Sequence, residues 1–384
     1  MTLLINKPLK FILKLLGLWP YNFNIFGPLI LASSIVTTLP FQLWYALISS
    51  ENPVMLMDGL SDMFAQTIIL IKIFIMWKNK RLINGLLKDV LNDWKVKKLP
   101  ANWKSISRTC TLFCRVVITM YATATTVYFP DLVLSYFGQP KEHRKLFFAS
   151  KYPFDYHSSP IYEIVILVQI IQCLLIVAAD LVSQTLLAAL ILHASAHMAL
   201  FKVYLRVYSD SIVSSRKLHG GYRCDKDNFM FLLKRIVKQH VKILDIVDRI
   251  DAVYSFVSLF QLLFSNVIIC VTGYVLITAV NLTNMLYLIK FLMFILVMFL
   301  QAFTFCFAGQ YLRNQGESLV HAVYDCEWYA GTPQEVRMLS LILFKTQNPL
   351  TLSGGKLFEL SANSFTMIVK TSLSYLSVLR AVYA

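Results

Sequence analysis

The sequence predicts an all-α membrane protein with seven transmembrane helices, a cytoplasmic amino terminus, an extracellular carboxyl terminus and a cytoplasmic helical anchor bundle. Three observations predict it. Hydrophobic residues make up 57% of the 384 residues and charged residues only 15%, which is far more apolar than a soluble globular domain. The apolar residues gather in runs of about the length that crosses a bilayer. The basic residues gather on one side of those runs.

The first 27 residues are expected to form a cytoplasmic amino-terminal segment with an interfacial helix. Lys7, Lys10 and Lys14 share one helical stripe, and the leucines and isoleucine among them lie largely off it. This pattern is typical of a helix that lies in the membrane surface. A cleaved signal peptide is the alternative, but no small-x-small cleavage pattern follows the apolar stretch before Pro20.

Residues 28–308 are expected to carry spans one to six, and residues 360–384 the seventh. Each span is a run of about 20 residues with almost no charge, the length that a helix needs to cross the hydrocarbon core. The seven runs are 28–48, 60–77, 109–130, 161 to about 200, 252–280, 283–308 and 360–384.

Two of these spans are expected to continue beyond the membrane. A continuous helix over 161–207 would be about 70 Å long, more than twice the thickness of the hydrocarbon core. The segment that leads into the fifth span, 233–250, repeats apolar residues on one helical face and basic residues on the other. These extensions would form a bundle beneath the membrane where subunits meet. Alternatively, they merely pack against their own chain.

Residues 309–359 are expected to form a cytoplasmic anchor segment that holds one short helix. Thr332, Pro333 and Glu335 fit a capping box, with Thr as the N-cap and Pro at the first helical position. Asn348 and Pro349 would end the helix. Its apolar stretch, 338–344, is about a third of the length of a span, so an eighth span is the less favoured alternative.

Basic residues set the orientation. With the amino terminus inside, the cytoplasmic segments hold 27 Lys and Arg, the extracellular loops hold four, and the other five of the 36 lie in spans. The positive-inside rule favours this arrangement. The asymmetry also explains the net charge of +15 better than nucleic-acid binding does. Seven spans then place the carboxyl terminus outside, the reverse of a G-protein-coupled receptor.

No enzyme, metal or cofactor site is expected. His193 and His197 are four residues apart, but the Glu of an HExxH motif is missing, so a packed histidine pair is favoured over a zinc site. Residues 353–356, Ser-Gly-Gly-Lys, lack the first glycine and the strand of a phosphate loop, which favours a turn. Lys72 and Lys290 are single charges in apolar runs and must face protein or water.

The last span carries hydroxyl groups along one face. At about 100° per residue, Ser361, Ser364, Thr371, Ser374 and Val378 fall within an arc of about 140°. A mildly polar face that ends in a small apolar residue suits a water-lined pore with a hydrophobic constriction. Close helix packing through small hydroxyl residues is the alternative, and the residues by themselves favour it slightly.

Four features of residues 303–384 carry a family resemblance. They are the segment 317–329 ending in Cys-x-Trp-Tyr, the short capped helix, the Ser-Gly-x-Lys turn and the Ser-Tyr-x-x-x-Leu-Arg ending. Together they are similar to the C-terminal third of insect odorant receptors. Upstream, YPFDYHSSPIYE (152–163) resembles the outer loop before the fourth span of that family. The seven-span layout with the amino terminus inside agrees over the whole chain.

Within the family, the chain resembles a ligand-tuned subunit. Its ending, Ser374-Tyr375 followed by Leu379-Arg380, departs from the ending of the related gustatory receptors. The shared co-receptor has a much longer loop between the fourth and fifth spans. One departure from the family is Leu376, where many members carry an aromatic residue.

The resemblance implies an odorant-gated, non-selective cation channel in the plasma membrane of olfactory sensory neurons, formed as a heterotetramer with the co-receptor. It implies that the last helix lines the pore, with Val378 at the gate and Ser374, Thr371 and Tyr375 beside the pathway. A second hypothesis stays open. In it, the chain is a seven-span receptor of gustatory or G-protein type that signals through a partner and has no pore of its own.

The resemblance also places a pocket for small volatile odorants in the outer half of the bundle, among the second, third, fourth and sixth spans. A mostly apolar wall with a few hydroxyls suits such ligands. Ordinary packing between spans is the alternative for each candidate. The residues expected to face the pocket are Phe64, Thr67, Ile71, Tyr121, Thr125, Tyr162, Val165, Gln169, Tyr287, Phe291 and Phe294.

Overall fold

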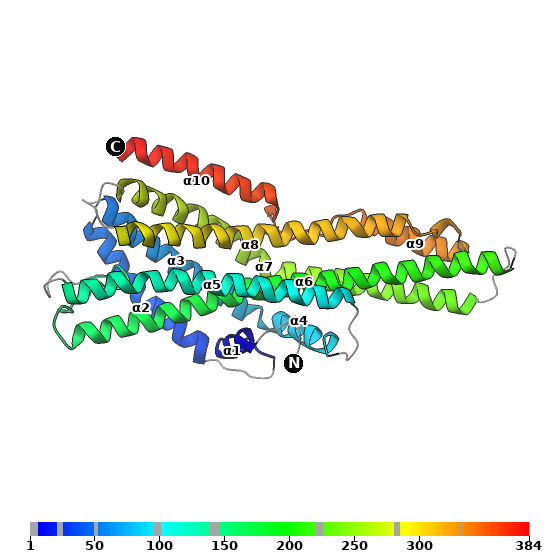
Figure 1. Ribbon diagram of the computed structural model, residues 1–384, viewed down its shortest axis with the longest axis horizontal. Helices are drawn as coiled ribbons and strands as arrows, with labels where there is room; N and C mark the ends of the chain where they lie inside the picture. Colours follow the sequence, from blue (N-terminus) through cyan, green and yellow to red (C-terminus); the bar gives the residue numbers. More distant parts are fainter. Residues whose placement is uncertain are drawn as a thin grey trace.

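The protein is a bundle of long helices that run along a common direction in the computed structural model (Figure 1). The structure describes residues 7–20, 26–49, 53–95, 101–138, 146–219, 226–279, 285–330 and 332–383. The elements are α1 (Lys7–Leu15), α2 (Phe26–Ile48), α3 (Pro53–Lys78), α4 (Lys80–Asp93), α5 (Ala101–Gly138), α6 (Ile161–His219), α7 (Lys226–Ala279), α8 (Met285–Tyr324), η3 (Trp328–Ala330), α9 (Pro333–Thr346), β1 (Ser353–Gly354), β2 (Phe358–Glu359) and α10 (Ala362–Tyr383).

Six of the described helices are long and apolar enough to cross a membrane: α2, α3, α5, α6, α7 and α8. They coincide with the first six predicted spans. The seventh predicted span is α10, whose 22 residues reach about 33 Å and so match a hydrocarbon core of about 30 Å. The predicted all-α membrane fold is therefore confirmed.

Several helices extend further than the apolar runs that predicted them. α5 continues through Pro130 to Gly138, and α8 continues from the predicted limit at residue 308 to Tyr324. The 59 residues of α6 span about 90 Å, so the predicted extension of this helix is confirmed. The ends of α6 and α7 project toward α9, at the opposite end of the molecule from the carboxyl terminus (Figure 1). We call the end near α9 the distal end and the other the proximal end.

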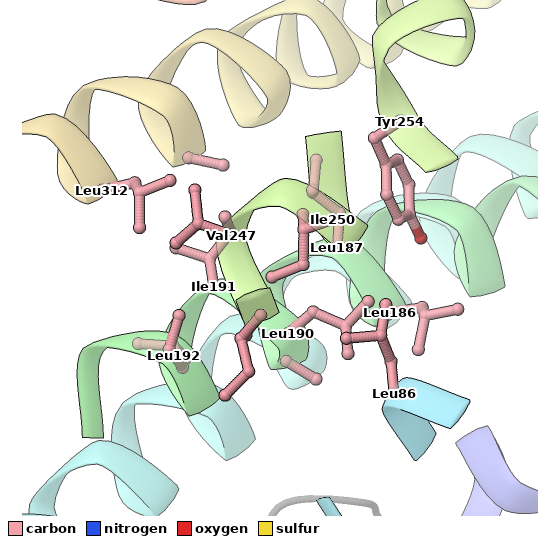
Figure 2. Close-up of a cluster of buried hydrophobic side chains, with 14 of the residues drawn as sticks. Leu86, Leu186, Leu187, Leu190, Ile191, Leu192, Val247, Ile250, Tyr254 and Leu312 are labelled. Atoms are coloured by element: carbon pink, nitrogen blue, oxygen red, sulfur yellow. The ribbon is translucent and has the colours of Figure 1, made fainter. Parts of the chain in front are cut away.

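A distal bundle is formed by α4, α9 and the residues 186–219 of α6, 226–254 of α7 and 309–324 of α8. The buried apolar side chains described in these elements belong to one continuous core. Figure 2 shows Leu187 and Ile191 of α6 beside Val247 and Ile250 of α7, with Leu86 of α4 near Leu186 and Leu312 of α8 on the other side. Leu233, Ile236 and Ile243 of α7 are completely buried, as the predicted apolar face requires.

The sequence analysis assigned no element to α4. Its buried residues recur at helical spacing, so the signal was present beneath the basic residues of this segment. They are Ile83, Asn84, Leu86, Leu87, Val90 and Leu91.

The predicted amino-terminal helix is α1. Its residues Leu9 and Leu13, and Leu16 directly after it, are buried in the core of the protein, whereas Phe11 is 68% exposed. The apolar face of α1 therefore packs mainly on its own bundle. This packing stabilises the position of the helix more than membrane contact alone would.

The short helix α9 begins at the predicted cap. Thr332 is the N-cap, Pro333 opens the helix, and the Glu335 carboxylate accepts a hydrogen bond from the Thr332 N–H at 2.8 Å. The 14 residues of α9 span about 21 Å, too short to cross a bilayer. The structure thus favours the short helix over an eighth span.

The Ser-Gly-Gly-Lys motif forms the turn of the β1–β2 hairpin, as expected. Gly355 (φ 61°) and Lys356 (φ 60°) both adopt the left-handed conformation that a tight hairpin turn needs. The Gly355 N–H donates to the Ser255 carbonyl at 2.8 Å. The Ser353 N–H and hydroxyl donate to the Asp251 carboxylate at 2.7 and 2.9 Å. The hairpin therefore ties the chain just before α10 to α7.

Candidate functional site

A cavity of about 110 Å³ lies between α3, α5, α6 and α8. These four helices are the second, third, fourth and sixth predicted spans. The wall is mostly apolar and includes Phe147 and Phe148 from the segment before α6, and Phe294 from α8. The volume approaches the ~150 Å³ of an engineered cavity that binds benzene. The cavity therefore suits a small, largely apolar guest.

The distal end of the cavity is closed by a buried ion pair. Lys72 of α3 contacts one carboxylate oxygen of Asp180 of α6, and the two residues are only 2% and 3% exposed. The other oxygen of Asp180 accepts hydrogen bonds from Tyr121 and Gln301, and from Gln184 at 3.3 Å. Charges in the membrane are stable only with such partners. The role of Lys72 that the sequence left open is thus an ion pair linking α3 to α6.

The polar network continues from the cavity into α7. Gln301 of α8 accepts a hydrogen bond from the Gln261 side chain at 2.8 Å, and the Gln261 amide also donates to Ser265 at 2.7 Å. Gln301 itself donates to the Tyr121 hydroxyl at 2.8 Å. The distal end of the cavity is therefore joined to α3, α5, α6, α7 and α8.

The proximal end of the cavity carries Asp62 and Gln66, one helical turn apart on α3. Asp62 is 8% exposed and accepts a hydrogen bond of 3.4 Å from the Ala149 N–H. The Gln66 carbonyl oxygen accepts from Thr38 at 3.2 Å and from Gln172 at 3.3 Å. The Gln66 amide nitrogen is buried and has no hydrogen-bond partner in the described part of the chain.

Three predicted ligand-contact residues line this cavity: Tyr121, Thr125 and Phe294. One other candidate, Gln169, lies beside it: the Gln169 carbonyl oxygen accepts from the Phe147 N–H at 3.0 Å and from the Phe148 N–H at 3.2 Å. Gln169 thus shapes the wall by holding the two phenylalanines. Odorant contact by any of these residues stays a prediction.

The structure places the other described candidates away from the cavity. Phe64 packs edge-on against Phe264, with ring centroids 5.9 Å apart, and Tyr162 stacks on Tyr136 at 5.9 Å. Thr67 donates to the Met63 carbonyl at 2.8 Å, and Ile71 borders an outer groove together with Phe74. Val165 is partly exposed, and Phe291 is buried with Tyr274.

The side chain of Tyr287 lies outside the described residues.

The polar residues at both ends of the cavity were not among the predicted contacts. Asp62, Gln66, Asp180 and Gln301 all line it, yet none was named as a ligand contact. A signal existed, because Asp62 and Gln66 are polar residues four apart in an apolar run and so share one helical face.

The predicted pore helix, α10, lies along the edge of the bundle beside α7 and α8 (Figure 1). Its packed side includes Phe365, 5.6 Å from Phe303, and Ser372, whose hydroxyl donates to the Asn266 side chain at 2.6 Å. Leu376 reaches Gly273, where an added Cβ would lie 3.2 Å away. Glycine at this position therefore lets α10 and α7 approach closely.

The predicted gate residues mostly lie on the other side of α10. Tyr375 and Val378 are 58% and 56% exposed, and Ser374 is also exposed. Thr371 is partly buried and its hydroxyl donates to Asn266 at 3.4 Å. The chain itself thus leaves uncovered the face that carries Ser374 and Val378.

A second cluster of titratable side chains lies in the distal bundle. The Asp93 carboxylate is 3.0 Å from His197 Nε2, 3.7 Å from His193 Nε2 and 2.7 Å from Lys242 Nζ. Burial raises the pKa of Asp93, but the hydrogen bonds from His197 and Lys242 lower it more, so this pKa lies below its usual range.

The bonding of the two histidines differs from that of metal ligands. Trp94 Nε1–H donates to His193 Nδ1 at 3.0 Å, which places the His193 proton on the Nε2 that faces Asp93. A metal-bound histidine instead donates its second N–H and leaves the facing nitrogen unprotonated. Asp93, His193 and His197 come close enough to be considered as metal ligands, but this bonding is that of a packed histidine pair.

The chain resembles known proteins in sequence. The family model described as 7tm odorant receptor matches residues 52–373. The chain is 32% identical over 162 residues to Odorant receptor 13a of Drosophila melanogaster, covering 39% of this chain and 38% of that protein. It is 28% identical over 147 residues to the odorant receptor coreceptor of Ooceraea biroi, covering 38% of this chain and 30% of that protein. The matches thus span well under half of either relative.

Solved structures share the fold. The insect olfactory receptor OR5 from Machilis hrabei, in complex with eugenol, superposes with a TM-score of 0.78 over 98% of this chain and 97% of that chain. Another structure of that receptor gives 0.74 over 97% and 96%. Sequence identity is 18% in both cases, so the likeness is one of fold.

Proposed function

Because the chain belongs to the insect odorant receptor family, we propose that it is an odorant-tuned subunit of a ligand-gated, non-selective cation channel. It forms a heterotetramer with the odorant receptor co-receptor. It acts as a multi-pass protein of the plasma membrane of olfactory sensory neurons, where it detects small volatile molecules. The family is a class of receptors and channels rather than of enzymes.

The observation that carries this proposal is that one helix, α7, borders both candidate sites. Met298, in the cavity wall, packs with Ile268 and Ile269 of α7. On the same stretch of α7, Asn266 binds the Ser372 hydroxyl and the Cys270 thiol donates to the Ser372 carbonyl at 3.5 Å. A guest that moves Met298 would displace α7, and α10 is hydrogen-bonded to α7. This continuity supports ligand gating through α7.

The uncovered face of α10 supports a pore. In a single chain Ser374 and Val378 face away from the packed side, which is the arrangement that a helix at a shared axis requires. Four such helices around one axis would bring their hydroxyl faces together. In this arrangement residues 360–384 form the pore-lining span, with Val378 as the gate and Thr371, Ser374 and Tyr375 beside the pathway.

The distal bundle supplies a surface for assembly. Leu341 and Phe344 of α9 are 64% and 70% exposed, which is unusual for large apolar side chains unless a partner covers them. In the proposed assembly, residues 309–359 form the cytoplasmic anchor, residues 1–27 form the cytoplasmic amino-terminal segment, and residues 28–308 hold six spans with the odorant pocket in their outer half.

We expect antibodies on unpermeabilised cells to reach a tag at residue 384 but not a tag at residue 1. The reason is the count of 27 basic residues on the proposed cytoplasmic side against four outside. Permeabilised cells, in which both tags are labelled, provide the control. Surface labelling of residue 1 alone would refute the orientation and favour a G-protein-coupled receptor.

We expect odorant-evoked cation current only when this chain is expressed with a family co-receptor. The exposed residues Lys234, Arg235 and Lys238 lie in the distal bundle, and four identical copies would crowd such charges, at a cost that salt screens only in part. A partner with a different charge pattern relieves this repulsion. The measurement is patch-clamp current with an odorant panel, with each subunit alone as the control.

The same recordings separate a channel from a receptor that signals through a partner. Current that persists in excised patches washed free of cytosolic nucleotides supports a pore built from these subunits. Loss of all current on washing would favour the receptor without a pore. Robust responses from this chain alone would refute the need for a co-receptor.

A further inference from the structure

We propose that the cavity between α3, α5, α6 and α8 binds compact alcohols, and that Asp62 and Gln66 recognise their hydroxyl group. This inference rests on the proposed odorant-receptor function and adds the chemical class of the ligand. It follows from a difference between the two ends of the cavity. The polar side chains that line one end already have their partners, whereas Asp62 and Gln66 at the other end keep unused hydrogen-bonding capacity.

The polar side chains that line the distal end of the cavity, Tyr121, Asp180 and Gln301, already have hydrogen-bond partners. One oxygen of Asp180 contacts Lys72, and the other accepts from Tyr121, Gln184 and Gln301. The Tyr121 hydroxyl, which donates to Asp180, also accepts from Gln184 at 2.7 Å. A polar ligand group placed here would have to break an existing bond. The distal end therefore closes the cavity but does not bind the polar group of the ligand.

The proximal end has unused capacity in both directions. The Asp62 carboxyl group lines the cavity and accepts a single hydrogen bond from the described residues, a long one of 3.4 Å from the Ala149 N–H. The nearby Lys290 is 3.8 Å from Asp58, so its charge is shared with that second carboxylate. Gln66, 1% exposed, has a buried amide nitrogen with no partner in the described part of the chain.

These two side chains stand four residues apart on α3, a spacing that sets their Cβ atoms roughly 5–6 Å apart on one face. One small polar group in the cavity is therefore close to both. The Asp62 carboxylate can bind a hydrogen-bond donor of the ligand, and the Gln66 amide nitrogen can bind an acceptor. A hydroxyl group is both at once.

Other common functional groups satisfy at most one of the two residues. An ether, ester or ketone oxygen accepts from Gln66 but donates nothing to Asp62. An ammonium group donates to Asp62 but leaves the Gln66 amide nitrogen without an acceptor. A hydrocarbon serves neither. Since unpaired buried polar groups are costly, the site discriminates against all three classes.

The body of the ligand must be compact and apolar. The cavity of about 110 Å³ is walled by aromatic and aliphatic side chains, including Phe148, Ile68 and Val297. A guest of about the size of a benzene ring fits such a volume. Benzyl alcohol and cyclohexanol are suitable probes.

The test measures binding directly. The full chain, carrying a fluorescent tag and purified with its co-receptor, is heated with increasing concentrations of benzyl alcohol, cyclohexanol, their methyl ethers or toluene. A ligand that binds the folded state raises the melting temperature by an amount that grows with the ratio of its concentration to its Kd. We expect each alcohol to bind at least about tenfold more tightly than its methyl ether, because the ether loses the bond to a buried carboxylate.

Variants of this chain then locate the effect. Asp62→Leu is expected to reduce the preference for alcohol over ether to about twofold or less, because only the alcohol donates to Asp62. Gln66→Leu is expected to weaken the binding of the alcohol and of its methyl ether alike, because both accept from Gln66. Toluene binding should be kept in both variants. Gln42→Leu is the matched control, because Gln42 is a buried glutamine of α2 without a partner for its amide atoms among the described residues and lies outside the cavity. It should keep the preference. Asp62→Asn replaces Asp62→Leu if the leucine variant does not fold.

Equal binding of alcohols and ethers, or a preference for alcohol over ether that is unchanged in Asp62→Leu, would overturn the inference. Unchanged affinity of both the alcohol and its ether in Gln66→Leu would also overturn it. If neither benzyl alcohol nor cyclohexanol binds, the inference is also overturned. The proposed channel function fails on a different measurement, odorant-evoked current, so the two failures can be told apart.

Discussion

Replacing Asp180 with leucine is expected to remove most of the folded protein from the cell surface. Lys72 would keep its charge at a position that is 2% exposed, with no carboxylate beside it. Breaking a buried ion pair in this way typically costs about 3–5 kcal/mol. That is a large part of the roughly 5–15 kcal/mol that stabilises a typical domain. Surface abundance and the melting temperature of the purified protein are the measurements.

A double variant and a surface variant make this prediction specific. Lys72→Met combined with Asp180→Asn removes both charges while an amide oxygen still accepts from Tyr121, so it should recover most of the stability. Glu317→Gln breaks the exposed ion pair with Arg313 and should leave surface abundance and the melting temperature nearly unchanged, because the Glu317 and Arg313 side chains are 53% and 39% exposed. Equal losses in Asp180→Leu and Glu317→Gln would show that the buried pair is not important for stability.

The second large effect is expected at the proposed gate. Val378→Ser should raise the current recorded without odorant, because a ring of apolar side chains closes a pore by excluding water and a hydroxyl lets water stay. A shift of about 1.4 kcal/mol in the balance of closed and open states corresponds to about a tenfold rise in the open fraction. The measurement is basal current relative to surface expression in cells that also express the co-receptor.

Leu373→Ser is the matched control for the gate. Leu373 is 59% exposed on α10, but it lies about 140° around the helix from Val378. It should leave the basal current unchanged. A normal basal current in a well-expressed Val378→Ser subunit would remove Val378 from the gate.

The membrane fold was predictable because apolar runs and charge asymmetry report directly on the bilayer. The same is true of α9, whose cap residues Thr332 and Glu335 are local signals that need no tertiary information. The extension of α7 was predictable from its apolar face. The extensions of α5 past Pro130 and of α8 past residue 308 were not, because hydropathy marks where a helix meets lipid and not where it ends.

The cavity could be predicted only in part, because lining residues depend on how each helix is rotated and tilted. Hydropathy showed that Lys72 needs a partner, but Asp180 lies 108 residues away and only the packing of α3 on α6 identifies it. Tyr121 and Phe294 were placed among the helices that enclose the cavity and do line it. Tyr162, an equally plausible candidate, is instead covered by Tyr136.

The hairpin before α10 has a mechanical consequence. Its bonds to Ser255 and Asp251 of α7 fix the distal end of α10, while the other end, near Val378, has no such anchor among the described residues. α10 can thus tilt about its fixed end at the hairpin, and the end near Val378 then moves furthest. Val378 lies 17 residues beyond Ser361, about 25 Å along the helix axis. A tilt of about 5° at the pivot would therefore carry Val378 sideways by about 2 Å, so a small rotation at the hairpin becomes a displacement comparable to the radius of a water molecule at the gate.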